Sequence, residues 1–227
     1  MQLMEAESTQ TTSGSDLAPG YARLRKRVFA WMLAKGNAKY ERAMAGRKRS
    51  LLGGLAGTVL EIGPGAGVNL GYYPPGIRWI GMEPNPYLHP YLKKAAEKHN
   101  LEADLRCGVA ERLDVADTSV DAVVSTLVLC SVPDVAATLR EVLRVLKAGG
   151  RFAFIEHVAA PRGTLLRRAQ GWLRPFSVFF ADGCHPDRET WTSIERAGFA
   201  EVKLEHFRAP TPLVSPHIAG VATKKAA

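Results

Sequence analysis

The fold is decided by the stretch Val59-Leu60-Glu61-Ile62-Gly63-Pro64-Gly65-Ala66-Gly67, in which an apolar run ends on an acid and opens into regularly spaced glycines. The run at 59–62 predicts a short buried strand. Gly63, Gly65 and Gly67 carry no β-carbon, which suits a backbone that turns sharply beneath a ligand. The sequence therefore predicts a ligand-binding turn at the end of a strand.

The spacing of the glycines separates this turn from the dinucleotide fingerprint. The pattern G-x-G-x-x-G would need glycine at position 68, where the chain has Val68. Glu61 also argues against a phosphate site, because a carboxylate repels phosphate and attracts a cation. A second acid, Glu83, follows the strand predicted at 78–82. In Rossmann-like sheets an acid at this place accepts hydrogen bonds from ribose hydroxyls.

The acid-x-Gly-x-Gly-x-Gly turn resembles motif I of the class I methyltransferases that use S-adenosylmethionine. The resemblance implies that the turn holds the amino-acid end of this cofactor, with Glu61 suited to its ammonium group. It also implies that residues 110 and 111 flank the adenine and that residues 126 and 127 run under the methionine portion. The cofactor-binding residues implied in this way are Glu61, Gly63, Pro64, Gly65, Gly67, Glu83, Pro84, Asn85, Ala110, Glu111, Thr126 and Leu127.

Length and composition place the chain among ordinary globular proteins. Its 227 residues suffice for one α/β domain, and 46% of them are hydrophobic. Cys107, Cys130 and Cys184 are far apart and form no C-x-x-C pair, so we expect neither a disulfide framework nor a metal site. No secretory signal and no run of about 20 apolar residues is found, which predicts a cytoplasmic protein without a transmembrane segment.

The net charge of +8 is concentrated near the amino terminus. Ten Lys or Arg stand against the single acid Glu41 in the segment 21–49, so the rest of the chain is close to neutral. A basic helix is most often a solvated face. Weak peripheral contact with an anionic membrane is an alternative, since residues 28–34 are apolar. RNA is another, but no RNA-binding signature is found elsewhere, and we expect no nucleic-acid partner.

The order of segments predicts an α/β fold with a mostly parallel, seven-stranded sheet flanked by helices. The resemblance implies that this is the Rossmann-like fold of a class I methyltransferase. We expect a disordered tail at 1–20, a helical extension or lid at 21–54 that packs over the ligand pocket, and a methyltransferase domain at 55–227. The expected strands are 59–62, 78–82, 103–107, 121–129, 151–157, 202–207 and 217–223. The expected helices are 21–34, 39–52, 84–99 and 135–146.

The second half of the chain carries a closer resemblance. The segments are Asp121-Ala122-Val123-Val124-Ser125-Thr126-Leu127-Val128-Leu129-Cys130-Ser131-Val132, Glu156-His157-Val158-Ala159, Asp182-Gly183-Cys184 and Pro216-His217-Ile218. Together they resemble the mammalian methyltransferase-like thiol S-methyltransferases. Similar small bacterial enzymes cap the reduced dithiols of natural products such as the dithiolopyrrolones. The resemblance implies a small thiol or reduced dithiol as acceptor, in detoxification, tailoring or self-resistance.

Thiol methylation needs alignment of two reactants and a thiolate. A free thiol has a pKa of about 8.5, so a nearby base would raise its reactive fraction. His157, at the end of a predicted strand, is the candidate base, with Asp182 and His217 as further catalytic candidates. Tyr40, Cys184 and His185 are expected on the substrate side. Direct transfer requires no enzyme nucleophile, so buried packing is the expectation for Cys130.

Three other functions stay open at this point. The acceptor could be an oxygen, nitrogen or carbon atom of another small molecule. The basic extension could hold RNA for an RNA methyltransferase. The domain could also bind S-adenosylmethionine without transferring a methyl group. The sequence fixes no oligomeric state.

Overall fold

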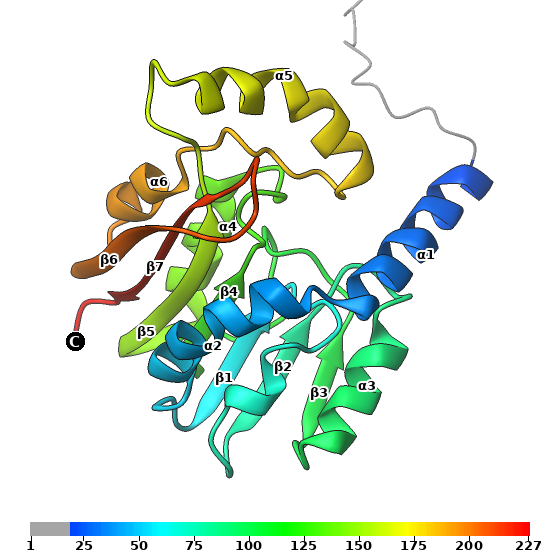
Figure 1. Ribbon diagram of the computed structural model, residues 1–227. Coiled ribbons are helices and arrows are strands. Elements are labelled where there is room, and N and C mark those ends of the chain that lie inside the picture. The colour runs from blue at the N-terminus through cyan, green and yellow to red at the C-terminus, as the bar shows by residue number, and fades with distance from the viewer. Residues whose placement is uncertain (1–18) are drawn as a thin grey trace, which may run out of the picture.

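The computed structural model describes residues 19–227, so the tail predicted at 1–20 lies almost wholly outside the described residues. Seven strands form one sheet in the order β3-β2-β1-β4-β5-β7-β6 (Figure 1). Strands β3, β2, β1, β4 and β5 are parallel, and β7 pairs antiparallel with both β5 and β6. The strands are β1 Thr58–Ile62, β2 Arg78–Met82, β3 Ala103–Arg106, β4 Val120–Thr126, β5 Leu146–His157, β6 Glu201–Arg208 and β7 Pro216–Thr223. The predicted seven-stranded, mostly parallel sheet is confirmed.

Helices cover both faces of the sheet. They are α1 Pro19–Lys35, α2 Ala38–Leu52, α3 His89–Lys98, α4 Val135–Val145, α5 Leu165–Phe180 and α6 Thr190–Arg196, with a 3-10 turn η1 at Leu70–Tyr72. Helices α4 and α6 pack on one face, where Leu139 and Ile194 join the main core. Helices α2 and α3 pack on the other face through Leu52 and Leu92.

The central strands are apolar on both sides because each side is covered by helices. In β1, Val59 and Leu60 are fully buried on opposite faces, and Phe152 and Phe154 of β5 are buried on the same face as Leu60. Each such side chain contributes roughly 1.5–3 kcal/mol relative to exposure. This core fixes the carboxyl ends of β1, β2, β4 and β5 along one edge of the sheet, which is where the polar residues follow.

Two predicted elements have different bounds at that edge. The fourth strand ends at Thr126 and not at 129, because Leu127 adopts a left-handed backbone with a φ of 59°. The helix expected from 84 begins at His89, since the Asn85 side chain accepts a hydrogen bond from the Tyr87 amide at 3.1 Å and forms a turn. Both differences place loops at the carboxyl ends of the strands.

Helix α1 is attached across this edge by polar contacts. The Arg25 guanidinium donates to the Phe179 carbonyl at 2.7 Å and lies 3.5 Å from the Asp182 carboxylate. On the other side, the Asn85 side-chain amide donates to the Lys26 carbonyl at 3.1 Å. These contacts join α1 to the end of α5 and to the loop after β2. Helices α1 and α5 thereby approach each other above the carboxyl ends of the strands (Figure 1).

Candidate functional site

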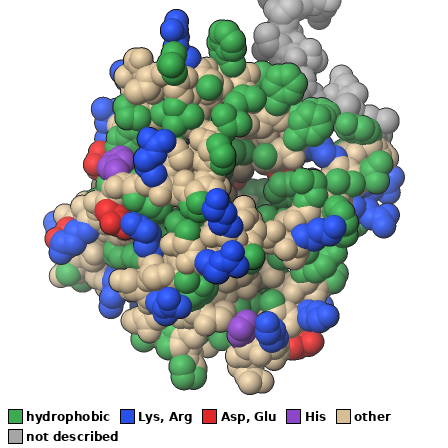
Figure 2. All heavy atoms as spheres, viewed as in Figure 1, with side chains coloured by type: hydrophobic (Ala, Val, Ile, Leu, Met, Phe, Trp, Pro, Cys, Tyr) green, Lys and Arg blue, Asp and Glu red, His purple; other side chains and the backbone are tan. Residues whose placement is uncertain are grey.

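A cavity of about 590 Å³ lies at the carboxyl ends of the strands, where open α/β sheets bind ligands. Its size falls within the usual range for small-molecule sites. Phe29 and Leu33 of α1 and Phe180 of α5 contribute to its walls, and Figure 2 shows apolar side chains around a hollow on this face. The predicted site residues that line it are Tyr40, Glu61, Gly63, Pro64, Gly65, Glu83, Pro84, Ala110, Glu111, Thr126, Leu127, His157, Asp182 and His217.

Four predicted site residues lie outside the cavity wall. Gly67 faces α3, where an added β-carbon would stand 2.9 Å from that of Ala95. Asn85 supports the loop after β2 and contacts α1, as described above. Cys184 lies behind the wall, 3.1 Å from His157. His185 lies beside Arg188 at 3.4 Å.

The glycine turn leaves room that a side chain would fill. Gly63 and Gly65 have φ values of 57° and 59°, in the left-handed region that favours glycine. A β-carbon on Gly63 would stand 2.6 Å from a methyl group of Val128, and one on Gly65 would stand 3.0 Å from Leu33 of α1. The turn therefore passes close to both the loop after β4 and the covering helix.

Glu61 is a buried carboxylate held by three donors. Its oxygens accept hydrogen bonds from the Asn69 amide at 2.8 Å, the Tyr73 hydroxyl at 2.8 Å and the Trp79 indole at 3.1 Å. Burial raises its pKa, and these hydrogen bonds together with the charge of Lys48 oppose the shift. The arrangement fixes an acidic group at the end of β1, in the wall of the cavity.

Asn69 is a site residue that sequence analysis missed. Its Nδ2 donates to both Glu61 and the Thr126 hydroxyl, the latter at 3.0 Å, so it links β1 to β4. Its Oδ1 atom is buried and has no hydrogen-bond partner among the described residues. An asparagine two residues after a glycine turn carries no distinguishing signal, because its role arises only when the strands pair.

Glu83 closes the same end of the cavity. One oxygen accepts from the Gly65 amide at 3.0 Å and the other from the Asn85 amide at 2.8 Å. Burial raises the pKa of this carboxyl, while the two amide donors oppose the shift. Glu83 thus joins the glycine turn to the end of β2 and keeps lone pairs for hydroxyl donors of a ligand.

Unpartnered polar atoms in the wall indicate what the cavity can hold. Tyr40 Oη, Asn69 Oδ1 and His157 Nδ1 are buried without hydrogen-bond partners among residues 19–227, and all three residues line the cavity. Buried polar groups are normally paired, so these atoms call for a polar ligand. Acceptors at Glu61 and Asn69 fit an ammonium group, and Glu83 fits a diol. The residues present therefore fit S-adenosylmethionine.

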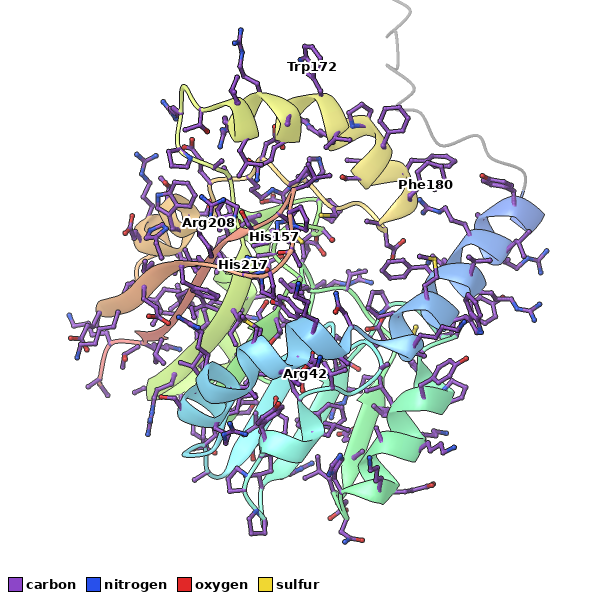
Figure 3. The ribbon with its side chains drawn as sticks, viewed as in Figure 1. Arg42, His157, Trp172, Phe180, Arg208 and His217 are labelled. Carbon is purple, nitrogen blue, oxygen red and sulfur yellow. The ribbon has the colours of Figure 1, made fainter. Side chains whose placement is uncertain are left out.

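A second group of polar side chains lies at the ends of β5 and β7. His157 is 5% exposed, and its ring centroid is 6.2 Å from that of His217. Figure 3 shows His157 and His217 close together at the ends of β5 and β7. The ring of Tyr40 lies 5.6 Å from His217, so the predicted residues of α2, β5 and β7 meet. His217 Nδ1 lies 3.1 Å from the Ser215 carbonyl, and burial lowers the pKa of this histidine to about 4. His217 is therefore neutral at neutral pH.

Glu156 organises the loop after β4 from beneath. Its carboxyl group contacts the Ser125 hydroxyl at 2.5 Å and accepts from the amides of Val128 and Leu129 at 3.2 Å each. Burial raises its pKa to about 8. An acid inside an otherwise apolar strand was a signal for this role, although the sequence does not name its partners.

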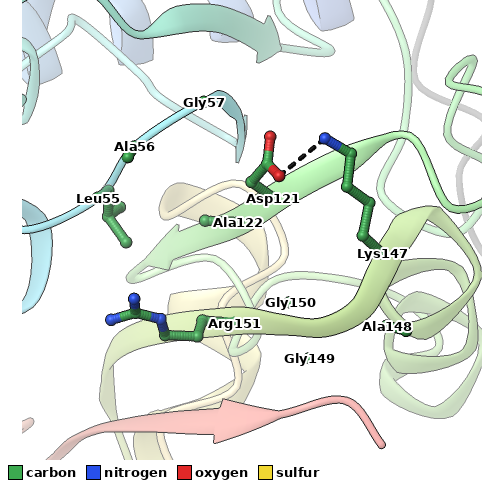
Figure 4. Close-up of a pocket in the computed structure, with 10 residues that line it drawn as sticks. All are labelled: Leu55, Ala56, Gly57, Asp121, Ala122, Lys147, Ala148, Gly149, Gly150 and Arg151. Atoms are coloured by element: carbon green, nitrogen blue, oxygen red, sulfur yellow. Dashed lines mark hydrogen bonds and ion pairs between the residues drawn. The ribbon is translucent and has the colours of Figure 1, made fainter. Parts of the chain in front are cut away.

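A smaller hollow of about 330 Å³ lies at the opposite, amino end of the strands (Figure 4). Asp121 and Lys147 form an ion pair of 2.7 Å at its edge. Its lining includes Gly57 before β1 and Arg151 of β5. None of the residues predicted to bind a ligand lies there.

The strand order, the glycine turn and the two buried acids define a class I methyltransferase with S-adenosylmethionine as cofactor. Residues 60–154 match the methyltransferase domain family. The chain is 42% identical to human thiol S-methyltransferase TMT1A, across 88% of this chain and 87% of that protein. Rat thiol S-methyltransferase TMT1B is 39% identical over the same shares. The chain belongs to this thiol S-methyltransferase family.

Solved structures share the fold at low sequence identity. A possible histamine N-methyltransferase from Thermotoga maritima has a TM-score of 0.62 at 22% identity, covering 90% of this chain and all of that one. Geranyl diphosphate C-methyltransferase from Streptomyces coelicolor, solved with S-adenosylhomocysteine, has a TM-score of 0.64 at 16% identity, covering 81% and 80%. Within residues 19–227, no helix combines the length and the apolar character needed to cross a bilayer.

Proposed function

We propose that this protein transfers a methyl group from S-adenosylmethionine to the sulfur of a small-molecule thiol. The observation that carries the proposal is the cavity itself, which joins an acidic cofactor end at Glu61 and Glu83 to a histidine end at His157. The family relationship supports sulfur as the acceptor atom, since the relatives at about 40% identity are named thiol S-methyltransferases.

The cofactor would occupy the acidic end. Glu61 and Asn69 Oδ1 would accept hydrogen bonds from its ammonium group, and Glu83 would accept them from the ribose hydroxyls. Ala110 and Glu111 would flank the adenine, and Thr126 and Leu127 the methionine portion. When bound, S-adenosylmethionine supplies an electrophilic methyl group on a sulfonium.

The acceptor thiol would occupy the histidine end. His157, Asp182 and His217 line the cavity there, and Tyr40 covers it from α2. The chain would align the thiol with the methyl donor and exclude water, which accounts for most of the catalytic effect expected in such a transfer. We place formation of the thiolate beside His157, because its Nδ1 atom is buried in this wall without a protein partner among the described residues.

The size of the cavity supports a small acceptor. A volume of about 590 Å³ lies in the usual range for small-molecule sites and suits the cofactor together with a small thiol. A reduced cyclic dithiol, methylated as a tailoring or self-resistance step, is the finer form of the proposal. The expected cytoplasmic location and the absence of a nucleic-acid partner stay predictions.

A labelled-methyl assay tests the proposed function. The full chain is incubated with methyl-labelled S-adenosylmethionine and, separately, small aliphatic thiols, aromatic thiols, reduced cyclic dithiols, phenols and amines. Mass spectrometry then locates the label in each product. We expect label on sulfur only, and much less of it with the Glu83→Ala variant at the same cofactor concentration. Label on a phenol or amine, with the thiols unchanged, would contradict the proposal.

A further inference from the structure

Three side chains with metal-binding atoms meet beside the histidine end of the cavity. Cys130 lies in the loop after β4, His157 ends β5, and Cys184 follows α5. Their ligand atoms, two sulfurs and one imidazole nitrogen, all lie within 4.8 Å of one another. His157 Nε2 and Cys184 Sγ are 3.1 Å apart. His157 lies 27 positions after Cys130 and 27 positions before Cys184, so the fold brings together three residues that are distant in the sequence.

Further contacts hold the two cysteine loops together. The His185 amide donates to the Cys130 carbonyl at 2.8 Å. Arg188 donates to the Leu129 carbonyl at 2.6 Å and the Val132 carbonyl at 2.8 Å, so its guanidinium supports the Cys130 loop from the side of Cys184. These bonds fix the backbone on which both sulfurs are mounted. The cluster is therefore a preformed arrangement and not a chance approach of flexible side chains.

The cluster lies directly behind the wall of the cavity. His157 and Ser131 line the cavity, and Cys130 Sγ is 3.5 Å from the Ser131 hydroxyl. Cys130 is 2% exposed, so its thiol is shielded from bulk water. An ion bound by the three atoms would lie next to the place where the proposed acceptor thiol enters.

We propose that Cys130, His157 and Cys184 bind a Zn²⁺ ion whose fourth position takes the sulfur of the acceptor. Two thiolates and one imidazole are a known donor set for zinc, and three protein ligands leave one position open for a water or a substrate. Thiolate ligands also favour zinc over hard cations such as Mg²⁺. The ion itself can be tested alone, but the role of its fourth position rests on the proposed function.

The chemistry balances without an added oxidant or reductant. Metal binding releases the protons of Cys130 and Cys184. The acceptor thiol gives its proton to the water that it replaces on the ion, and that water leaves through the cavity. A lone pair of the bound sulfur forms the new bond to the methyl carbon, while the bond from that carbon to its sulfonium donor breaks. The neutral thioether is a weaker zinc ligand than a thiolate and leaves.

Cobalt binding tests the site without any turnover. Metal-free full-length protein is titrated with Co²⁺, which gives a thiolate-to-metal absorption band when cysteines bind it. We expect one Co²⁺ per chain, displaced by Zn²⁺, with affinity at least about a hundredfold lower in Cys130→Ser and Cys184→Ser. Cys107→Ser is the matched control, because Cys107 is an exposed cysteine outside the cluster. Circular dichroism and thermal melting check that each variant folds.

The same titration separates the inference from the proposed function. A small thiol should shift the cobalt spectrum, and the alcohol with oxygen in place of sulfur should not. Absence of a thiolate band in the folded wild type would overturn the inference, as would a disulfide between Cys130 and Cys184 in freshly prepared protein that takes up no metal. Full-rate methyl transfer by metal-free protein would overturn it and leave the proposed function intact. Metal binding without transfer to any thiol would contradict the proposed function alone.

Discussion

Glu83 shows how one residue connects two strand ends in the wall of the cavity. Its two oxygens hold the amides of Gly65 and Asn85 at 3.0 and 2.8 Å, and it is 5% exposed. A carboxylate in this position both shapes the glycine turn and presents lone pairs to the cavity. Removing it would therefore disturb the wall and the ligand contact together.

Cofactor affinity should fall in Glu83→Ala and in Gly63→Val. Loss of two hydrogen bonds from the Glu83 carboxylate to the ribose costs roughly 1.5–3 kcal/mol each, together a factor of about 10²–10⁴ in Kd for Glu83→Ala. A side chain at Gly63 would meet Val128 at 2.6 Å. Isothermal titration calorimetry with S-adenosylmethionine measures both effects. Gly149→Val is the control, because it has similar backbone strain at a φ of 72° and an added β-carbon there has no neighbour within 4 Å. Unchanged cofactor affinity in all three variants would refute the site.

His157→Ala should slow methyl transfer most for thiols of high pKa. An acidic thiol is already ionised at neutral pH and has less need of the imidazole. The same dependence on the pKa of the thiol is expected whether the imidazole takes the proton itself or acts through a bound zinc ion. Rates across thiols of graded pKa measure the effect, with the exposed His206→Ala as control. An equal loss for every thiol would assign His157 a structural role.

Helix α1 is the element that closes the cavity. Phe29, Met32 and Leu33 line the wall, and Leu33 stands 3.0 Å from the position of a β-carbon on Gly65. The Arg25 guanidinium holds the helix to α5, and the Asn85 side chain holds it to the loop after β2. Deleting the basic extension to test RNA binding would therefore also remove part of the small-molecule site.

Arg25→Ala should loosen α1 and weaken cofactor binding. The variant loses the hydrogen bond to Phe179 and the half-exposed ion pair with Asp182, about 1–2 kcal/mol together. We expect faster amide hydrogen exchange in residues 19–35 and a rise of roughly tenfold in the cofactor Kd. Arg42→Ala, an exposed arginine of α2, is the control (Figure 3). Unaltered exchange in α1 would argue against this attachment.

The elements differ in how far the sequence predicts them. Strands β1, β2 and β5 follow from apolar runs that end on polar residues, and the helices 21–34 and 39–52 follow from their glycine boundaries. The end of β4 does not, because Leu127 leaves the strand only through its left-handed backbone, with Glu156 holding the next amides. Helix α5 was not predicted; it carries exposed aromatic residues, including Trp172 at 85%, so no buried stripe marks it clearly.

The stability of the whole molecule depends on pH through a histidine buried in its core. His217 is 1% exposed among Tyr40, His157 and Phe207, and its pKa is lowered to about 4 from an ordinary 6.5. The unfolded chain therefore binds a proton before the folded chain does. The stability that the neutral ring contributes is complete above about pH 6.5 and is lost as the pH falls toward 4.

Urea unfolding at several pH values should reveal this loss. When the whole shift of the His217 pKa contributes, the free energy of unfolding falls by roughly 3 kcal/mol as the pH falls from 6.5 to 4. His217→Asn keeps a donor for the Ser215 carbonyl but does not titrate, so its curve should be flatter over this range. Identical curves for the variant and the wild type would exclude His217 as the source.

The sequence predicts the parts of the site whose residues lie near one another in the chain, but not the parts whose residues only the fold brings together. Glu61, Gly63 and Glu83 lie close to one another in sequence and in space, and their grouping at one end of the cavity could be predicted. The cluster of Cys130, His157 and Cys184 could not, because the spacing of its cysteines matches no local metal motif. It exists only once the loop after α5 packs against the ends of β4 and β5.

The most direct test of the central claim is a competition in one vessel. Equal amounts of a small thiol, the corresponding alcohol and the corresponding amine are mixed with the protein and methyl-labelled S-adenosylmethionine, and the labelled products are separated. We expect the S-methyl thioether to be the only labelled product above a control without protein. Preferential labelling of the alcohol or amine, or no product from a protein that binds the cofactor, would contradict it.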